Sequence, residues 1–228
     1  MEKLIIAGIG TNSRLALSFI EYHRLFDVIG FAVNAQYKTC DRFHDRPVYT
    51  LEHLREEVGH DDFKVFIAVL WNRLNTDRRN MYEFCRSQGY PLANLISPLA
   101  VVRSEITGDN IWLHDHVVVQ NDTIIGSDTA VMQGTLIGAN CQVGAHCFFG
   151  AHAILGGGST VGEQSFIGIR STVFDGTSIG RKCIVGACTA VKRNMPDFSK
   201  YATSSDFVIK QYSEDEVCEK LMYKKNQR

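Results

Sequence analysis

Two histidines in the second half of the chain, His146 and His152, are the side chains best suited to proton transfer. Imidazole ionises close to neutral pH, and it often removes the proton from an attacking nucleophile. Asp128 stands 18 residues before His146, which is one coil of the repeat described below, and a carboxylate there would orient the imidazole. The pattern favours a general base at one of these histidines, and a solvated corner position is the simpler alternative for each.

A glycine-rich turn near the start of the chain has the character of an anion site. The segment Gly8-Ile9-Gly10-Thr11-Asn12-Ser13 follows an apolar run, Leu4–Ala7, and opens a helix-like stretch. Backbone amides and the positive end of a helix dipole meet at such a place, which suits a phosphate. However, Ser13 replaces the third glycine of a dinucleotide fingerprint, and Asn34 stands where an acidic residue would end the second strand. A tight strand-to-helix turn needs the same glycines, so both interpretations stay open.

The first hundred residues alternate between strand-like and helix-like stretches. A first helix is expected to end near His23, and Gly89 stands where a glycine closes a helix. Such alternation predicts a small parallel α/β sheet of the Rossmann-like kind. The expected strands are Leu4–Ala7, Val28–Val33, Pro47–Tyr49 and Val65–Leu70, and the other expected helices are Leu51–Val58 and Thr76–Gln88.

The second half of the chain carries a six-residue repeat. From Ile125 to Val185, a small residue stands four positions after each large apolar residue, and a glycine directly follows most of these apolar residues. This is the hexapeptide signature of a parallel β-helix. The large apolar residues return at every sixth position without an insertion, at Leu113, Val119, Ile125, Val131, Ile137, Val143, Phe149, Leu155, Val161, Ile167, Val173, Ile179, Val185 and Val191.

The repeat gives each residue type a place in the coil. The large apolar side chain fills a narrow prism, the small residue fits near a corner, and the glycine lets the chain turn where a side chain would collide. Three hexads make a coil of 18 residues, so residues 18 apart stack about 4.8 Å apart, as strands do in a sheet. Cys141, Cys147 and Cys183 occupy small-residue positions, which predicts that they are buried. A flat-sided prism of this kind is expected to form a homotrimer.

A short α/β domain followed by a left-handed hexapeptide β-helix resembles the sialic-acid O-acetyltransferase and bacillosamine-pathway N-acetyltransferase group of bacterial sugar acyltransferases. The resemblance extends from Leu4 to about Lys200. It implies acetyl-CoA as the acyl donor, a nucleotide-linked sugar as the acceptor, and a groove for acyl-CoA between neighbouring subunits. For the sugar nucleotide it implies Gly8, Gly10, Thr11, Asn12, Ser13 and Asn34. For the pantetheine arm it implies Gly157, Gly168, Ile169 and Ala187.

The resemblance also shows that the usual catalytic histidine is missing. In the group, this histidine and its acidic or histidine neighbour fall at Ala139 and Asn140 of this chain. The candidate catalytic residues are therefore His152, His146 and Asn140, and His152 is favoured because it adjoins the glycine run Gly156–Gly158. A positioned sugar amine attacks a thioester with less help from a base than a hydroxyl needs. The substitution at Ala139 thus favours transfer to an amino group.

Two other functions stay open at this point. Some members of the group with the same fold acylate a sugar hydroxyl. A catalytically silent trimer that only binds a nucleotide sugar would also lack the base. A zinc site is not expected, because His146 and His152 stand at different corners of the prism.

Composition and charge indicate which partners and which cell compartment to expect. Lys and Arg total 24 against 25 for Asp and Glu, which argues against a nucleic-acid partner. The longest apolar run, Val65–Trp71, is too short to cross a bilayer, and seven cysteines without a clustered pattern suit the cytoplasm. The expected domains are residues 1–98 for the nucleotide sugar, 99–200 for acyl transfer, and 201–228 as a tail with a short helix at Ser213–Leu221.

Overall fold

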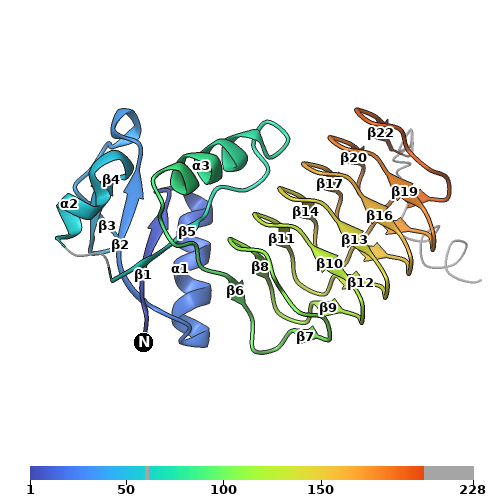
Figure 1. The fold of residues 1–228 in the computed structure, drawn as a ribbon, viewed down its shortest axis with the longest axis horizontal. Helices are drawn as coiled ribbons and strands as arrows, with labels where there is room; N and C mark the ends of the chain where they lie inside the picture. The colour runs from blue at the N-terminus through green and yellow to red at the C-terminus, as the bar shows by residue number, and fades with distance from the viewer. Residues whose placement is uncertain (60–61, 203–228) are drawn as a thin grey trace, which may run out of the picture.

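The computed structural model describes residues 1–59 and 62–202, which form an α/β domain followed by a β-helix (Figure 1). This architecture confirms the predicted fold class. The first strand of the β-helix, β6 (Leu95–Ile96), already pairs with β8 (Trp112–Leu113), so coil pairing begins at Leu95. The expected tail helix at Ser213–Leu221 lies outside the described residues.

A five-stranded sheet forms the centre of the α/β domain, in the order β3-β4-β2-β1-β5. β4, β2, β1 and β5 run parallel, as predicted, but β3 pairs antiparallel with β4 at the edge. The sheet is mixed because His44 and Asp45 both adopt positive φ, 46° and 58°, and close a tight hairpin. The strands are β1 (Lys3–Ala7), β2 (Asp27–Val33), β3 (Arg42–Phe43), β4 (Arg46–Thr50) and β5 (Lys64–Ile67).

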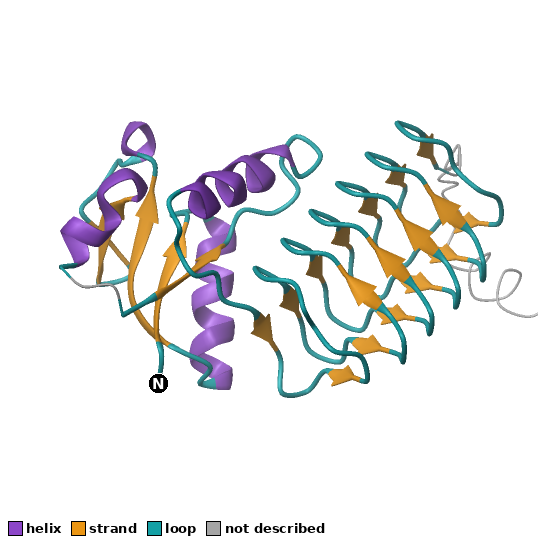
Figure 2. Cartoon of the chain, in the orientation of Figure 1, coloured by secondary structure: helices purple, strands orange, loops and turns teal. Residues whose placement is uncertain are grey.

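Helices cover both faces of this sheet (Figure 2). Leu4 and Ile6 of β1 point to the face covered by α1, and Ile5 points to the face covered by α2 and α3, because successive side chains of a strand alternate. The predicted helices are confirmed, and Gly89 follows the last of them with φ of 69°. The helical segments are α1 (Thr11–His23), η1 (Ala35–Tyr37), η2 (Leu51–His53), α2 (Leu54–Val58) and α3 (Thr76–Ser87).

The rest of the chain winds into a prism with three parallel sheets. Its strands stack at the predicted spacing of 18 residues, so that Ile124 pairs with Gln142. The sheet that packs on the α/β domain, here the domain-facing sheet, contains β6, β8, β11 (Ala130–Val131), β14 (Phe148–Phe149), β17 (Phe166–Ile167), β20 (Ile184–Val185) and β22 (Lys200–Tyr201). The second sheet contains β7 (Val101–Val102), β9 (Val118–Val119), β12 (Leu136–Ile137), β15 (Ile154–Leu155), β18 (Thr172–Val173) and β21 (Ala190–Val191). The third contains β10 (Ile124–Ile125), β13 (Gln142–Val143), β16 (Thr160–Val161) and β19 (Ser178–Ile179).

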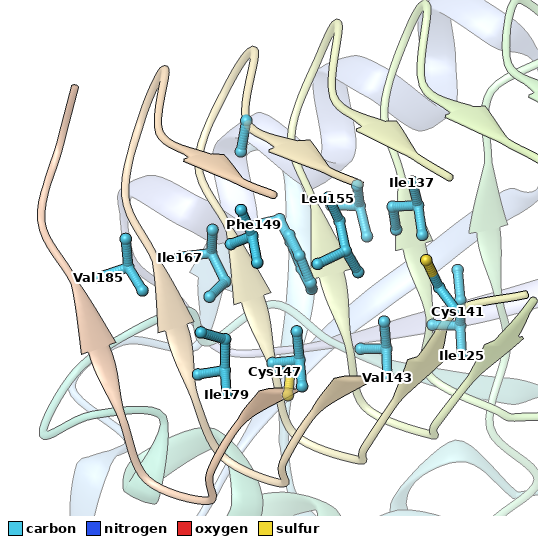
Figure 3. Packing of buried hydrophobic residues seen from close by; sticks show 14 of the residues in the cluster. Ile125, Ile137, Cys141, Val143, Cys147, Phe149, Leu155, Ile167, Ile179 and Val185 are labelled. Atoms are coloured by element: carbon cyan, nitrogen blue, oxygen red, sulfur yellow. The ribbon is translucent and has the colours of Figure 1, made fainter. Parts of the chain in front are cut away.

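The large apolar residues of the repeat fill the inside of the prism (Figure 3). Cys141, Cys147 and Cys183 are fully buried among them, as predicted. Burial raises the pKa of the Cys147 thiol to about 12, so this residue serves packing and not chemistry. On the outside of the domain-facing sheet, Trp112 and Phe148 pack into the same core as α1 and β1, which fixes the two domains together.

Each corner of the prism turns through a residue with positive φ, three positions after the apolar anchor. Asn140, His146 and His152 all occupy this position, with φ of 57°, 60° and 57°. The glycine directly after the anchor is needed for a different reason. A Cβ placed on Gly126 would lie 2.4 Å from the backbone nitrogen of Ala145 in the next coil.

Candidate active site

The turn between β1 and α1 is held by contacts within itself. Gly8 has φ of 125°, and a Cβ placed there would lie 2.6 Å from Oγ of Ser13. Ser13 is buried, and its Oγ accepts a hydrogen bond from the Gly10 amide at 3.3 Å. A Cβ placed on Gly10 meets no atom within 4 Å, and Thr11 is exposed. The N-terminus of α1 is therefore accessible to a ligand.

A cavity of about 780 Å³, here the sheet-edge cavity, opens where β1, β2 and β5 end. Gly8 and Asn34 line it, together with Asn72 and Arg73 from the loop after β5. The strand order reverses between β1 and β5, and open α/β sheets bind their ligands outside the carboxyl ends of strands at such a point. The sheet-edge cavity therefore lies where sheets of this kind bind their ligands.

The acidic residue that is absent from the end of β2 comes from another part of the chain. Glu52 accepts a hydrogen bond from Nδ2 of Asn34 at 3.1 Å and another from the Ala35 amide at 3.0 Å. Partial burial would raise the pKa of Glu52, but these hydrogen bonds hold it below its usual value. No motif in the sequence marks Glu52, because only the fold brings it beside Asn34.

An apolar groove of about 310 Å³ follows the corner between the domain-facing and second sheets. Gly168, Ile169 and Ala187, three of the residues expected to contact pantetheine, line it. Phe148 and Phe166 form part of its floor, with stacked rings 5.1 Å apart. Small residues beside an apolar floor suit an extended pantetheine arm.

Gly157, the fourth residue expected to contact pantetheine, lies elsewhere. It stands at the corner between the second and third sheets, where its amide donates a hydrogen bond to Oδ1 of Asp175 at 2.7 Å. One protomer therefore does not bring Gly157 to the apolar groove.

A third cavity, of about 540 Å³, lies between α1 and the first coils of the β-helix, and we call it the α1 cavity. Its walls are rich in aromatic side chains, namely Phe19, Tyr22, Trp71 and Trp112. The α1 cavity and the apolar groove are adjacent, because both are lined by Trp71, Met132 and Gln133.

Two histidines and an aspartate line the α1 cavity, and no motif in the sequence marks any of them as a site residue. Nε2 of His23 lies 2.8 Å from Oδ1 of Asp115, and Ser97 donates its hydroxyl hydrogen to the same oxygen at 2.5 Å. Burial lowers the pKa of the neighbouring His114 to about 4, so its ring is neutral at pH 7. His23 and Asp115 are 92 residues apart, and no spacing rule connects them.

His146 lies at the corner between the third and domain-facing sheets. Its Nδ1 is 2.7 Å from Oδ2 of Asp128, which confirms the pairing suggested by the 18-residue spacing. Nε of Arg78 lies 3.2 Å from the same carboxylate oxygen, and Asn110 donates to the other oxygen at 2.6 Å. The alternative of a solvated position is wrong for His146, because α3 covers this corner. His146 lines none of the three cavities described above.

The other two candidate catalytic residues lie at other corners. His152 is exposed, its ring rests against Gly134, and it makes no side-chain hydrogen bond to any residue of ranges 1–59 and 62–202. Asn140 is exposed beside Ala139, at the corner between the second and third sheets. His146, His152 and Asn140 thus occupy three different corners and do not meet within one protomer.

Among the described residues, no cluster of three His, Cys, Asp or Glu side chains has the arrangement of a metal site. No helix in this part of the chain combines the length and apolar character needed to cross a membrane.

Two family models match the β-helix. The model described as bacterial transferase hexapeptide (six repeats) matches residues 122–157, and the model described as hexapeptide repeat of succinyl-transferase matches residues 158–193. No curated protein matches the chain in a sequence search.

Solved structures share the whole architecture. A histidine mutant of GDP-perosamine N-acetyltransferase from Caulobacter crescentus, in complex with CoA and GDP-perosamine, is 28% identical over 88% of this chain and 93% of that chain, with a TM-score of 0.77. PerB from the same organism, with the same two ligands, is 28% identical over 88% and 94% of the two chains, with a TM-score of 0.76.

A more distant structure shares the fold. The acetyltransferase domain of PglB from Neisseria gonorrhoeae is 23% identical over 89% of this chain and 97% of that chain, with a TM-score of 0.77. The hexapeptide models, the order of the two domains and the likeness over almost nine-tenths of the chain lead to one conclusion: this chain is an acyltransferase similar to the hexapeptide-repeat enzymes that modify sugars.

Proposed function

We propose that the chain transfers the acetyl group of acetyl-CoA to an amino group of a nucleotide-linked sugar in glycoconjugate biosynthesis. One observation carries the proposal: the three cavities meet around the loop of residues 69–73. Asn72 and Arg73 line the sheet-edge cavity, Leu70 and Trp71 line the α1 cavity, and Trp71 also lines the apolar groove. A nucleotide, its sugar and an acyl-CoA therefore have adjacent places.

The nucleotide belongs in the sheet-edge cavity. Gly8 and Asn34 line it, and the exposed start of α1 at Thr11 would supply backbone donors for a diphosphate. Asn12 lines the α1 cavity instead, so the sugar that follows the diphosphate would pass Asn12 on its way to the acyl donor. The neighbours that bind GDP-perosamine support this class of acceptor.

Acyl-CoA belongs in the apolar groove, where Gly168, Ile169 and Ala187 would contact the pantetheine arm. We propose that Gly157 reaches CoA from a second chain, in a homotrimer whose grooves lie between protomers. Ile124 and Ile154 support an assembly, because they project from the third and second sheets with 59% and 42% of their surface exposed.

Ala139 favours an amine as the nucleophile. A neutral sugar amine forms the new C–N bond to the thioester carbon, the C–S bond breaks, and the amine loses one proton while CoA leaves as the thiol. An alcohol would have to be deprotonated as it attacks, a step that typically costs about 10²–10⁴-fold in rate without a base. An N-acyltransferase tolerates the missing histidine better than an O-acyltransferase does.

We also propose that the reaction takes place in the cytoplasm. Cys40, Cys85, Cys141, Cys147, Cys183 and Cys188 are free thiols, and the described residues form no disulfide among them. Reduced cysteines suit a reducing compartment.

The test is acetyl-CoA turnover with GDP-perosamine and with a panel of nucleotide-linked amino and hydroxy sugars. We expect release of the CoA thiol and an amide product with at least one amino sugar. Acylation of hydroxy sugars alone would show O-transfer instead. Tight binding of a nucleotide sugar without thiol release for any acceptor would show a catalytically silent protein.

A further inference from the structure

The pair formed by His23 and Asp115 has the arrangement of a general base and its orienting group. Nε2 of His23 lies 2.8 Å from Oδ1 of Asp115. An ionised carboxylate only accepts hydrogen bonds, so Nε2 carries the hydrogen and Nδ1 of the neutral ring keeps its lone pair. The His23 side chain makes no other hydrogen bond to a residue of the described chain, which leaves Nδ1 available to a proton.

Asp115 is held in the form that this role needs. Partial burial would raise the pKa of Asp115, but hydrogen bonds from Ser97 and His23 keep it below its usual value. The carboxylate is therefore ionised at neutral pH. Its side chain is 35% exposed, whereas the His23 side chain is only 6% exposed. The imidazole is thus fixed in place at the edge of a cavity.

The α1 cavity around this pair suits a sugar ring. Aromatic side chains with a few convergent polar groups are typical of small-molecule sites, and here Tyr22, Trp71 and Trp112 accompany His23 and Asp115. His114 lines the same cavity, and its Nε2 is buried without a hydrogen-bond partner in the described residues. A buried polar atom left unpaired costs free energy, and a ligand hydroxyl or a water would relieve it.

Neither of the other histidines considered for catalysis combines these features. His146 is oriented by Asp128, but it also contacts α3 and lines none of the three cavities. His152 is exposed, and its ring makes no hydrogen bond to a described residue that would orient it. A base needs both orientation and access to the nucleophile.

We propose that the α1 cavity binds the acceptor sugar and that His23, oriented by Asp115, accepts the proton released by the sugar amine. This inference rests on the proposed N-acyltransfer. The nitrogen lone pair forms the C–N bond to the thioester carbon as the C–S bond breaks. The proton passes from the nitrogen to Nδ1 of His23 and then to the departing CoA sulfur, so the products are an amide and CoA thiol.

Two substitutions in the full-length protein test the pair. His23→Gln retains an amide that can donate to Asp115 but removes the base. We expect kcat to fall by about 10²-fold, the lower end for general-base catalysis because an amine needs less help than an alcohol, while the KM for acetyl-CoA stays unchanged. Asp115→Asn keeps the shape and removes the charge that stabilises the imidazolium, so kcat should fall by at least about tenfold. His53→Gln is the matched control, because His53 is exposed on the surface, where its Nδ1 lies 3.4 Å from a carboxylate oxygen of Glu56.

The pH profile of kcat/KM separates catalysis from a structural effect. Asp115, His114 and the Tyr22 ring are the titratable groups that face His23. Removal of the carboxylate in Asp115→Asn destabilises the imidazolium, so the acid limb of the profile should shift to lower pH. In His23→Gln the limb due to imidazole should disappear, and only the titration of the acceptor amine should remain.

Two control measurements separate a loss of catalysis from a loss of folding. CoA affinity and the melting temperature of each variant show whether the protein still folds. Variants that fold and keep their rate within about threefold, with the acid limb unchanged, would overturn the role of His23. A large loss of kcat in His152→Ala, with none in His23→Gln, would show that His152 is the base instead. No turnover by the wild-type protein with any acceptor would refute the proposed function itself.

Discussion

His146 and Arg78 share the carboxylate of Asp128, and this joint contact holds the third helix to the β-helix. Nδ1 of His146 lies 2.7 Å from Oδ2 of Asp128, and Nε of Arg78 lies 3.2 Å from the same atom. Arg78 also donates to the backbone oxygens of Asp128 and Cys147, at 3.1 Å and 2.9 Å. Because α3 follows the loop of residues 69–73, this contact helps fix the loop where the three cavities meet.

Asp128→Asn tests this docking contact. Asp128 and Arg78 are 0% and 2% exposed, so the substitution leaves a buried guanidinium without its counter-charge. Breaking a buried pair in this way typically costs about 3–5 kcal/mol, and we expect a loss of this size in the free energy of unfolding. Urea denaturation followed by circular dichroism measures it.

Glu83→Gln is the control on the same helix. Its exposed pair with Arg79, at 2.7 Å, should contribute about 0.5 kcal/mol or less. Equal losses for Asp128→Asn and Glu83→Gln would contradict a special role for the buried contact.

Gly10→Val tests the phosphate site at the start of α1. Gly10 has φ of −110° and open space around its Cβ position, so valine should leave the turn and the fold intact. The new side chain would cover the amides that face the ligand. We expect the KM for the nucleotide sugar to rise at least about tenfold, with CoA affinity unchanged.

Gly8→Ala provides the contrast in the same turn. A Cβ there would lie 2.6 Å from Oγ of Ser13 at a φ of 125°, so this variant should lose stability whether or not a ligand binds. An unchanged KM in Gly10→Val for every nucleotide sugar would show that the turn has a purely structural role.

Periodic features were predictable from the sequence, and contacts between the domains were not. The 18-residue coil placed His146 beside Asp128 and the three cysteines inside the prism, because each hexad position has one environment. His23 and Asp115 meet only because α1 packs against the first coil, which depends on the outward faces of Trp112 and Phe148. No local pattern carries that information.

The same limit explains two differences in the α/β domain. Glu52 reaches Asn34 through the packing of β4 beside β2, so its role was invisible in the glycine-turn motif. The antiparallel β3 depends on positive φ at His44 and Asp45, residues that take this conformation less readily than glycine or asparagine and so gave no turn signal.

The buried ring of His114 should make the free energy of unfolding depend on pH. Burial lowers its pKa from 6.5 to about 4 in the folded protein, so between these values the unfolded chain binds more protons than the folded one. Stability should therefore rise with pH across this window, be fully present above pH 6.5, and decline as the pH falls toward 4. Melting temperatures measured across the window should show this slope.

His114→Phe isolates the contribution of this ring. Phenylalanine can keep the stacking on Trp112, whose ring centroid lies 4.4 Å from that of His114, but it cannot bind a proton. The slope should flatten in this variant and persist in His53→Gln, where an exposed histidine is removed. An equal slope in wild type and His114→Phe would contradict the assignment.

The proposed homotrimer predicts that two inactive variants restore each other. Ile169→Glu places a charge in the apolar groove, where Ile169 is 48% exposed, and Gly157→Leu fills the corner that should reach CoA from the next chain. Neither variant should turn over acetyl-CoA alone. In mixed trimers, a wild-type site forms when a chain with an intact groove meets a neighbour with an intact Gly157. Random mixing of equal amounts should therefore recover about a quarter of the wild-type activity, one half times one half.

Sedimentation would confirm the assembly, and the control is the same mixture before the chains exchange. A stable monomer with full activity, or a mixture that stays inactive after exchange, would show that each protomer builds its site alone.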